Sequence, residues 1–558
     1  MGRGRSTAGA RCCAGHRAVP VVELPVAEMP VAHSKSMRRT SPAGLALLAV
    51  LSLTSTFVAL ETSPAGAAVP AGFRDDLVAS LAGPTALAFT PDGRMLVTTQ
   101  AGTVRVVKNQ VLMQVVALNI SSRVCSNSER GLLGVAVDPN FATNGYVFLY
   151  YSFKKTGTCD ATTVNRVSRW VMTGDTLAGE TVLVDNIPSP AGNHNAGDVE
   201  FGKDGYLYVS VGDGGCDYAG GGCGGGNDAS RDQHVLVGKI LRITRDGGIP
   251  ADNPFQGAGT ARCNVTGTTT AGNKCQETFA WGLRNPFRMA FDPNAVDTRF
   301  HINDVGQGAW EEVDLGNAGA DYGWNVREGH CANGSTSDCG APPAGMTNPI
   351  FDYGRTDGCG SITGGAFVPN GLWPADYQGK YLFSDYNCGK IFHLDPSGGG
   401  FNRVDFATGL GSGSAVHLRF GPYGSTQALY YTTYAGGGQI RRIATTAAVP
   451  SVLVTGFTWY DIGIASQSGP GSTAVRAFGT QLKPATQYYL VTAPPESDPA
   501  LTCSRNLQAV NGAVRRSSGS GFVGTTTGLI DRPVGNWNVC FRSLDGTTVG
   551  APVQFTVV

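Results

Sequence analysis

A phrase of two short strands joined by a turn rich in Pro, Asp and Gly recurs along this chain. It occurs six times, as ALAFTPDGRMLVTT, GVAVDPNFATNGYVFLYYS, VEFGKDGYLYVSVGD, RMAFDPNAVDTRFHIND, GAFVPNGLWPADYQGKYLFSDY and LRFGPYGSTQALYYTTY. Several copies are followed by a further short strand, as in GKILRI and GQIRRI. Each unit therefore has material for about four antiparallel strands, and repeated units of this kind build radial β architectures. The repeat predicts an all-β fold with a six-bladed β-propeller over residues 73–443.

The repeat also predicts where chemistry should lie. Six units over this range average roughly 60 residues, which exceeds a blade of about 40 to 50 residues, so we expect insertions. The largest lies between the third and fourth copies, at CDYAGGGCGGGNDAS. Because the loops of a propeller gather around the mouth of its central channel, we expect functional side chains in the loops between strands.

The segments outside the repeat have compositions of their own. Residues 37–68 carry two arginines, an apolar run and then small residues, which predicts a secretory signal peptide. The run is shorter than the roughly 20 apolar residues of a membrane anchor. We expect Met37 to be the true start, which makes residues 1–36 a mis-annotated extension. Residues 444–452 read as a linker, and the short strands of 453–558 predict a C-terminal Ig-like β-sandwich domain.

The cysteines agree with export to an extracellular or periplasm-like compartment. Two of the 14 cysteines, Cys12 and Cys13, precede the expected start, which leaves 12, an even number that suits disulfides. Neighbour pairing is one choice among many, and no spacing resembles a zinc site. The pairs it predicts are Cys125–Cys159, Cys216–Cys223, Cys263–Cys275, Cys331–Cys339, Cys359–Cys388 and Cys503–Cys540.

The charge of the chain excludes two classes of partner. Only 15% of the residues are charged, and 42 basic residues balance 42 acidic ones. This composition lacks the basic surface expected for binding nucleic acid or an anionic membrane. We therefore expect neutral or small partners and no membrane insertion.

His194 lies in the Gly-flanked loop GNHNAG, just ahead of the third copy, and Asp213 ends that copy. An imidazole with an ordinary pKa near 6.5 suits a general base, provided that a carboxylate such as Asp213 holds its tautomer. A surface-loop histidine bonded to a neighbour is the alternative. Arg284 and Asn285 lie in GLRNPF, where Pro286 biases the backbone away from helix and displays a cation that suits anionic oxygens. The alternative is an arginine between blades that binds backbone carbonyls.

A third group is acidic. Glu311, Glu312 and Asp314 precede a Gly/Ala turn that leads to Asp321 and Tyr322. Hard oxygen ligands gathered by a turn suit Ca²⁺, although the spacing is not that of an EF-hand. A solvated acidic strand edge is the other interpretation.

Five motifs in order carry a family resemblance: ERGLLGVAVDPNF, the His194 loop with FGKDGYLYVSVGDGG, GKILRI, GLRNPFRMAFDP and VGQGAWEEVDLGNAGADYGW. Together they resemble the soluble sugar dehydrogenases that depend on pyrroloquinoline quinone (PQQ), the glucose/sorbosone dehydrogenase family. The resemblance covers about residues 73–443. It implies a secreted propeller that binds PQQ and Ca²⁺ at its mouth and oxidises a sugar CH–OH group, with an electron acceptor that the sequence does not name.

The resemblance also implies roles for particular residues. His194 falls on the catalytic base, with Asp213 in support, and Arg284 joins them in the catalytic set. His194, Arg284 and Asn285 also fall among the cofactor-binding residues. Glu129 and Asn193 fall among the cofactor contacts. The backbone carbonyls of Gly306 and Gln307 match the segment that holds the cofactor's Ca²⁺. Glu312 and the carbonyl of Tyr322 match a second, structural Ca²⁺ site.

Three departures from the family pattern keep other functions open, and the first is Glu129, which stands where a neutral glutamine contact is expected and adds negative charge. Asn387 stands where a lysine is expected on the fifth blade, and GSGSAVHLRF stands where paired arginines are expected on the last. PQQ is a tricarboxylate whose binding needs positive charge. The alternatives are a non-catalytic propeller that binds glycan or protein, and a Ca²⁺-dependent lactonase, because a fold does not set a function.

Overall fold

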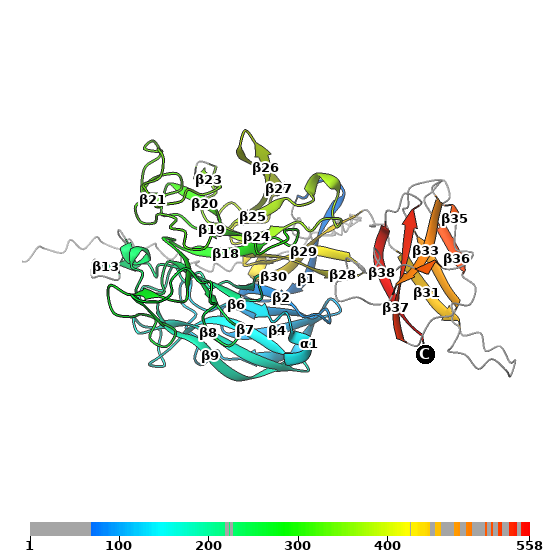
Figure 1. Ribbon diagram of the computed structural model, residues 1–558, viewed down its shortest axis with the longest axis horizontal. Coiled ribbons are helices and arrows are strands. Elements are labelled where there is room, and N and C mark those ends of the chain that lie inside the picture. Colours follow the sequence, from blue (N-terminus) through cyan, green and yellow to red (C-terminus); the bar gives the residue numbers. More distant parts are fainter. Residues whose placement is uncertain are drawn as a thin grey trace, which may run out of the picture. The chain divides into compact units, whose positions relative to one another are not determined.

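The computed structural model describes residues 68–217, 222–223, 227–355, 357–424 and 426–446, together with strands between 452 and 557. Within residues 68–446, six four-stranded antiparallel sheets stand around a common centre (Figure 1). The predicted six-bladed propeller is thereby confirmed. Of residues 1–67, which include the predicted extension and all but the last residue of the predicted signal peptide, none is among the described residues.

The innermost strands contact one another from blade to blade and close the ring. They are β2 (Pro84–Phe89), β6 (Leu132–Val137), β10 (Val199–Phe201), β18 (Pro286–Phe291), β24 (Ile362–Phe367) and β28 (His417–Tyr423). Each is followed by the strand with which it forms a hairpin: β3 (Met95–Thr99), β7 (Tyr146–Phe153), β11 (Leu207–Val211), β19 (Phe300–Asp304), β25 (Tyr381–Asp385) and β29 (Thr426–Thr433). These twelve strands are the six copies of the repeated phrase.

Third and fourth strands complete each blade. The third strands are β4 (Thr103–Lys108), β8 (Val164–Thr173), β14 (Lys239–Ile243), β20 (Trp310–Leu315), β26 (Lys390–Ser397) and β30 (Gln439–Thr445). The outer strands are β5 (Val111–Asn119), β9 (Thr176–Pro188), β17 (Thr278–Trp281), β23 (Phe351–Gly354), β27 (Gly400–Ala407) and, for the last blade, β1 (Phe73–Ser80). Since β1 pairs with β30, the two ends of the repeat close one blade together.

Apolar side chains fill the gap between each pair of adjacent blades. Phe148, Val167 and Leu183 of the second blade pack on Val209 and Leu241 of the third, and the five other gaps hold clusters of the same kind. Strands such as β3 and β11 are buried along their whole length because both of their faces meet a neighbouring blade. Burial on both faces explains why these strands are apolar without alternation.

Short inserted elements and disulfides lie in the connections between the blade strands. The third blade carries β12 (Cys216–Asp217), β13 (Gly222–Cys223), the short helix η1 (Asp228–Arg231) and the strands β15 (Thr260–Ala261) and β16 (Lys274–Cys275). Four predicted disulfides are present in the described part: Cys125–Cys159, Cys263–Cys275, Cys331–Cys339 and Cys359–Cys388. The side chains of the other two predicted pairs, Cys216–Cys223 and Cys503–Cys540, lie outside the description. None of the described helices has the length and apolar character needed to cross a bilayer.

The C-terminal region contains two sheets. One joins β31 (Val452–Thr458), β32 (Ala474–Gly479) and β36 (Val523–Thr526). The other joins β34 (Gln508–Ala509), β33 (Gln487–Ala493), β37 (Gly535–Ser543) and β38 (Thr548–Val557), with β35 (Arg515–Arg516) pairing β33. The predicted Ig-like sandwich depends on side chains and connections outside the described residues, and it stays a prediction.

Candidate active site

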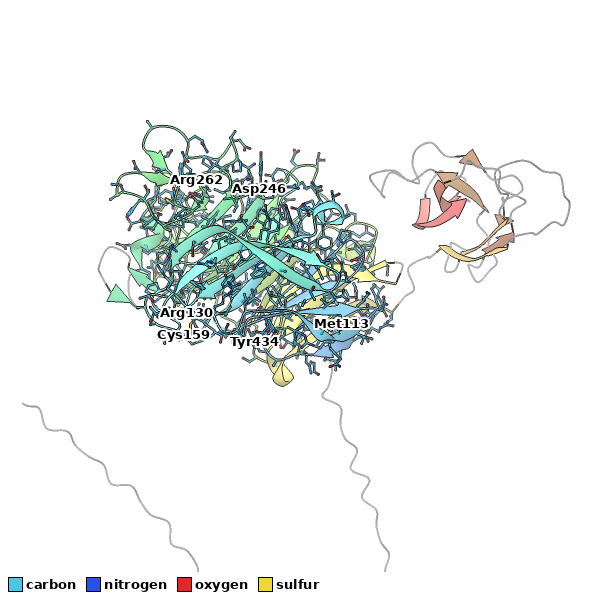
Figure 2. All side chains as sticks on the ribbon, turned by 90° about the horizontal axis from the view of Figure 1, so that it is seen from below. Met113, Arg130, Cys159, Asp246, Arg262 and Tyr434 are labelled. Atoms are coloured by element: carbon cyan, nitrogen blue, oxygen red, sulfur yellow. A yellow bond between two sulfur atoms is a disulfide. The ribbon has the colours of Figure 1, made fainter. Side chains whose placement is uncertain are left out.

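A cavity of about 490 Å³ lies where the inner strands begin. All six blades contribute to its lining, which includes Thr85, Gln100, Glu129, His194, Arg284, Asn285, Arg288, Gly306, Gln307, Arg355, Ser361, Tyr386 and Tyr434. Tyr434, of the last blade, is labelled in Figure 2 at the lower edge of the propeller. The loops gather at one mouth, as the sequence predicts.

His194 is held between an acid and a cation. Its Nδ1 lies 2.6 Å from Asp213 Oδ1, and its Nε2 lies 2.8 Å from Arg284 Nη2. A guanidinium only donates hydrogen bonds, so Nε2 accepts and the imidazole proton lies on Nδ1. The side chain is buried, with 8% of its surface exposed. The structure therefore presents a neutral imidazole that lines the cavity and accepts a hydrogen bond from Arg284 through Nε2, rather than a surface histidine.

Asp213 is itself fixed by three further donors. Its Oδ1 also accepts the Gly215 backbone N–H at 2.8 Å, and its Oδ2 accepts Trp324 Nε1 at 2.9 Å and Asn227 Nδ2 at 3.2 Å. Four donors converge on one carboxylate that is 2% exposed. This carboxylate is thereby rigid enough to set the imidazole tautomer.

The His194 loop needs backbone that lies very close to another chain segment. His194 and Ala196 have positive φ of 51° and 48°. A Cβ on Gly212, at the end of β11, would lie 2.0 Å from the His194 carbonyl oxygen. Glycine at this position is therefore required for the loop to pack against β11. The Asn193 amide lies over Gly215, where a Cβ would be 2.1 Å from its Oδ1, and not in the cavity lining.

Arg284 is positioned by groups of its own blade. Nη1 donates to the Val305 carbonyl at 2.8 Å, and Nε donates to Gln307 Oε1 at 3.1 Å. Asp304 accepts the backbone N–H groups of Arg284 and Asn285 at 2.8 and 2.6 Å. Burial raises the pKa of Asp304 to about 7, while these N–H groups favour its charged form. The arginine does bind backbone, but it also reaches His194.

Glu129 joins the second blade to the third and fourth. Its Oε2 accepts the His194 backbone N–H at 2.7 Å and Asn285 Nδ2 at 3.3 Å. The adjacent Arg130 is buried and donates to Ser189 Oγ at 3.1 Å, and it lies beside the disulfide to Cys159 (Figure 2). These contacts of Arg130 hold the neighbouring Glu129 in position.

The backbone carbonyls of Gly306 and Gln307 accept hydrogen bonds from Arg355, a residue that the sequence analysis did not single out. Arg355, which follows β23, donates from Nη2 to the Gly306 carbonyl at 2.8 Å and from Nη1 to the Gln307 carbonyl at 3.1 Å. Gly306 leaves no room for a side chain, because a Cβ would lie 1.6 Å from the Trp310 carbonyl oxygen. The two carbonyls assigned to the cofactor's Ca²⁺ therefore bind a guanidinium here.

Glu311, Glu312 and Asp314 lie on β20, where successive side chains point to opposite faces of the sheet. Glu312 and Asp314 point to one face of β20 and lie with Asp304 in a buried group whose oxygens are within 4.8 Å of one another. Burial and the neighbouring carboxylates raise the pKa of Glu312 and of Asp314 well above the ordinary range. Both oxygens of Asp314 are buried without a hydrogen-bond partner. Such a set of oxygens fits a hard divalent cation better than it fits a solvated edge.

Tyr322 lies near this acidic group. Burial raises the pKa of its phenol, and the Asp314 and Glu312 carboxylates add to the effect. Its phenol donates to the Leu315 carbonyl. The carbonyl of Tyr322 as a metal ligand stays a prediction. Glu311 points to the other face and pairs with Arg355.

Sequence reasoning missed Asp304, Arg288, Trp324 and Arg355. A signal for Asp304 was available, since the third, fourth and fifth copies of the repeat carry an aspartate at their end, in VGD, IND and FSD. Asp385, from the fifth copy, accepts the backbone N–H groups of Gly360 and Ser361, as Asp304 does for its own blade. The other three side chains come from positions with no equivalent pattern.

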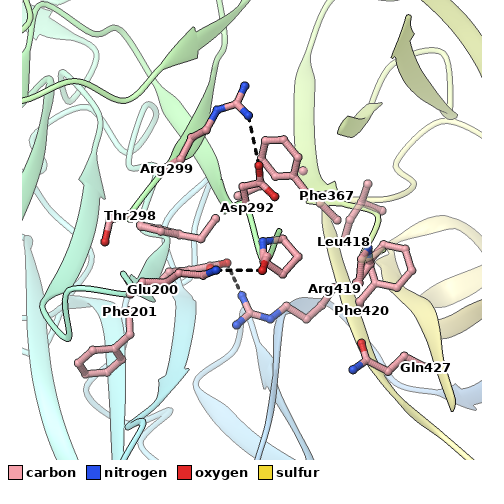
Figure 3. Close-up of a pocket in the computed structure, with 17 residues that line it drawn as sticks. Glu200, Phe201, Asp292, Thr298, Arg299, Phe367, Leu418, Arg419, Phe420 and Gln427 are labelled. Atoms are coloured by element: carbon pink, nitrogen blue, oxygen red, sulfur yellow. Dashed lines mark hydrogen bonds and ion pairs between the residues drawn. The ribbon is translucent and has the colours of Figure 1, made fainter. Parts of the chain in front are cut away.

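A second cavity, of about 290 Å³, lies at the opposite ends of the same strands (Figure 3). Phenylalanines from four inner strands line it, together with the ion pairs Glu200–Arg419 and Arg299–Asp292. Four of its five charged side chains are paired with one another and the fifth, Lys203, donates to backbone carbonyls, whereas Arg284 at the first mouth faces a neutral imidazole. The first mouth is therefore the better candidate for chemistry.

Comparison with known proteins identifies the family of the chain. A sequence profile described as Glucose / Sorbosone dehydrogenase matches residues 81–441. HIPL2 protein of Arabidopsis thaliana is 29% identical over 327 residues, which is 48% of this chain and 44% of that protein. Quinoprotein glucose dehydrogenase B of Acinetobacter calcoaceticus is 27% identical over 48% of this chain and 57% of its own length. The chain thus spans about half the length of these relatives.

A solved structure shows the same fold. The PQQ-bound form of aldose sugar dehydrogenase from Streptomyces coelicolor aligns with a TM-score of 0.50 at 22% identity, over 68% of this chain and 99% of that one. The profile covers the ring of blades except β1 and the last residues of β30, and it covers the complete lining of the mouth described above. The chain belongs to the glucose/sorbosone dehydrogenase family.

Proposed function

We propose that this protein is a secreted quinoprotein that oxidises a CH–OH group of a sugar, an aldose or a related compound, with PQQ as its cofactor. Membership of the family supports a sugar dehydrogenase of this type. The observation that carries the finer proposal is the neutral His194, with its proton held on Nδ1 by Asp213 and its Nε2 bonded to Arg284. The four described disulfides suit an oxidising compartment outside the cytoplasm.

The cavity has the charge and size for PQQ. Its described lining carries three arginines, Arg284, Arg288 and Arg355, against the single carboxylate of Glu129. Guanidinium groups bind carboxylates in a planar fork, which suits a flat tricarboxylate. A volume of about 490 Å³ is within the range of sites for small ligands. Arg284 and Asn285 would hold the cofactor, with Glu129 beside them.

In the proposed reaction, PQQ when bound supplies the two-electron acceptor. The chain's own residues manage the proton. A sugar hydroxyl would take the place of Arg284 as the partner of His194 Nε2. The imidazole would take the hydroxyl proton while the hydride of the C–H bond leaves for the two-electron acceptor. Asp213 stabilises the imidazolium that results, since it already holds Nδ1–H at 2.6 Å. Arg284, released from the imidazole, stabilises negative charge at the reacting centre.

A structural Ca²⁺ fits the buried acidic group on the fourth blade. Glu312, Asp314 and Asp304 would supply its carboxylate ligands. Its bound charge would offset the burial and the mutual repulsion that raise the pKa values of Glu312 and Asp314. We propose this ion as a support for β19 and β20, which carry the loop from Val305 to Gln307.

Reconstitution tests the proposed function. The secreted protein is loaded with PQQ and Ca²⁺, and reduction of a dye is followed against a panel of sugars. We expect a sugar-dependent signal that His194→Ala abolishes. His393→Ala is the matched control, because His393 also contacts an aspartate through Nδ1, at 2.9 Å from Asp395, but lies outside the cavity lining. Failure to take up PQQ would exclude the quinoprotein.

A non-catalytic propeller is the second candidate. Asn387, in place of the expected lysine, and the last-blade sequence favour it, because they leave less positive charge for a cofactor. The same panel separates the two, since a pure binder gives no sugar-dependent dye reduction in any loaded state. A loss of signal confined to His194→Ala would exclude the binder.

A further inference from the structure

Two arginines already occupy the carbonyl oxygens of one turn at the mouth. Val305, Gly306 and Gln307 follow β19 in sequence. The carbonyl of Val305 accepts from Arg284, and the carbonyls of Gly306 and Gln307 accept from Arg355. Three consecutive carbonyls therefore face guanidinium groups. A divalent cation placed among them would be repelled by two positive charges.

Arg355 is held firmly in this position. Glu311, which is fully buried, forms an ion pair with it and also accepts the Ile362 backbone N–H at 3.0 Å. The segment after Arg355 is tied by the Cys359–Cys388 disulfide to the turn after β25. Moving Arg355 away to admit a metal ion would leave the Glu311 carboxylate buried without its cation, which is strongly unfavourable.

The guanidinium still has hydrogen-bonding capacity to offer. Nη2 donates to the Gly306 carbonyl and to Glu311, whereas Nη1 carries two N–H groups and donates one of them, to the Gln307 carbonyl, and the side chain is 28% exposed. Arg355 lines the cavity. An exposed guanidinium N–H that borders a cavity and has no acceptor among the described residues suits a ligand that brings a carboxylate.

We infer that Arg355 is the cation that binds a carboxylate of the ligand at this part of the mouth, so that PQQ binds with no Ca²⁺ ion between it and the carbonyls of Gly306 and Gln307. The inference rests on the proposed function, which names PQQ. The guanidinium of Arg355 lies where the family resemblance implies the cofactor's Ca²⁺. The structural Ca²⁺ at Glu312 is a separate site.

Metal content tests this directly. The full chain is equilibrated with Ca²⁺, with and without PQQ, then freed of unbound ions, and its calcium is counted by mass spectrometry of the elements. We expect the same number of Ca²⁺ ions per chain in both states. One additional Ca²⁺ for each PQQ bound would overturn the inference and leave the proposed function standing. No uptake of PQQ would overturn both.

A variant pair adds a second measurement. In Glu311→Gln/Arg355→Gln the buried carboxylate is removed with its partner, so no unpaired charge remains. We expect the Kd for PQQ, measured by absorbance titration, to rise about 10- to 100-fold, as for loss of a hydrogen bond between charged groups. Arg299→Gln, at the opposite mouth, is the control for loss of an arginine. An unchanged Kd in a folded variant would overturn the inference, and the metal count of the unaltered protein decides if the variant does not fold.

Discussion

Substituting Gly212 by alanine probes the packing that positions the candidate base. Gly212 follows β11, and its φ is not in the left-handed region, so the backbone itself accepts alanine. The added Cβ, however, would lie 2.0 Å from the carbonyl oxygen of His194 and 3.1 Å from Asn285 Oδ1. The substitution therefore acts by contact alone.

The size of the effect follows from these distances. Real Cβ contacts are essentially never shorter than 3.0 Å, so β11 and the His194 loop must separate by at least 1.0 Å. Asp213 is the next residue, and the same separation would take its 2.6 Å bond to Nδ1 beyond hydrogen-bond range. A displacement of about 1 Å costs roughly 100-fold in rate, and an overpacked site costs about 1–3 kcal/mol of stability.

Two measurements check this prediction. Gly212→Ala should lower kcat of the PQQ-loaded protein about 100-fold with a smaller change in KM, and it should lower the denaturation midpoint in urea. Gly308→Ala is the matched control, because it lies beside the same mouth and its Cβ would meet nothing within 4 Å. A Gly212→Ala protein whose kcat stays within threefold of the unaltered protein would refute the reasoning that this close contact positions His194.

Three further predictions concern the frame of the site. Adding Ca²⁺ at about 100 times its Kd should stabilise the protein by about 2.7 kcal/mol, seen as a higher Tm than in chelator, and Asp314→Asn should lose this gain; an equal Tm in both buffers would contradict the proposed metal site. Replacing Cys359 and Cys388 together by serine should cost about 3–4 kcal/mol of unfolding free energy in a denaturant titration, because the disulfide closes a loop across a separation of 29 residues. Burial raises the pKa of Glu200 to about 7 from 4.5, so its contribution to stability is complete below pH 4.5 and is lost as the pH rises to 7, by about 3 kcal/mol. Glu200→Gln should flatten the stability of the protein between pH 5 and 7, and an unchanged slope would contradict this.

The sequence predicted the local part of the fold. Each repeated phrase joins two strands that pair with each other across a turn of a few residues, and all six form the inner hairpins of blades. The pattern did not predict that β1 completes the last blade, because β1 and β30 are separated by more than 350 residues and carry no shared motif.

Some contacts of the site were predicted from the sequence, and others were found only in the structure. His194 and Asp213 are 19 residues apart, on either side of one hairpin, and their contact was predicted from that placement. Arg355, in contrast, follows the outer strand of the fourth blade, and no pattern around it signals a ligand. Its contacts with Gly306 and Gln307 join residues 49 and 48 positions apart, and they form because β23 pairs with β20 within one blade.

By itself, the sequence determined the number of blades and the residues that can carry acid, base and metal chemistry, since these follow from local turn chemistry and repeated spacing. It left the pairing of the cysteines open, and the structure decided among the choices in favour of neighbours for the four described disulfides. Only the tertiary structure decided which of those side chains meet. His194 and Arg284 are 90 residues apart and Asn285 and Glu129 are 156 apart, yet each pair is within hydrogen-bond distance. Apolar packing between blades closes the ring, and ring closure places the start of every inner strand at one mouth.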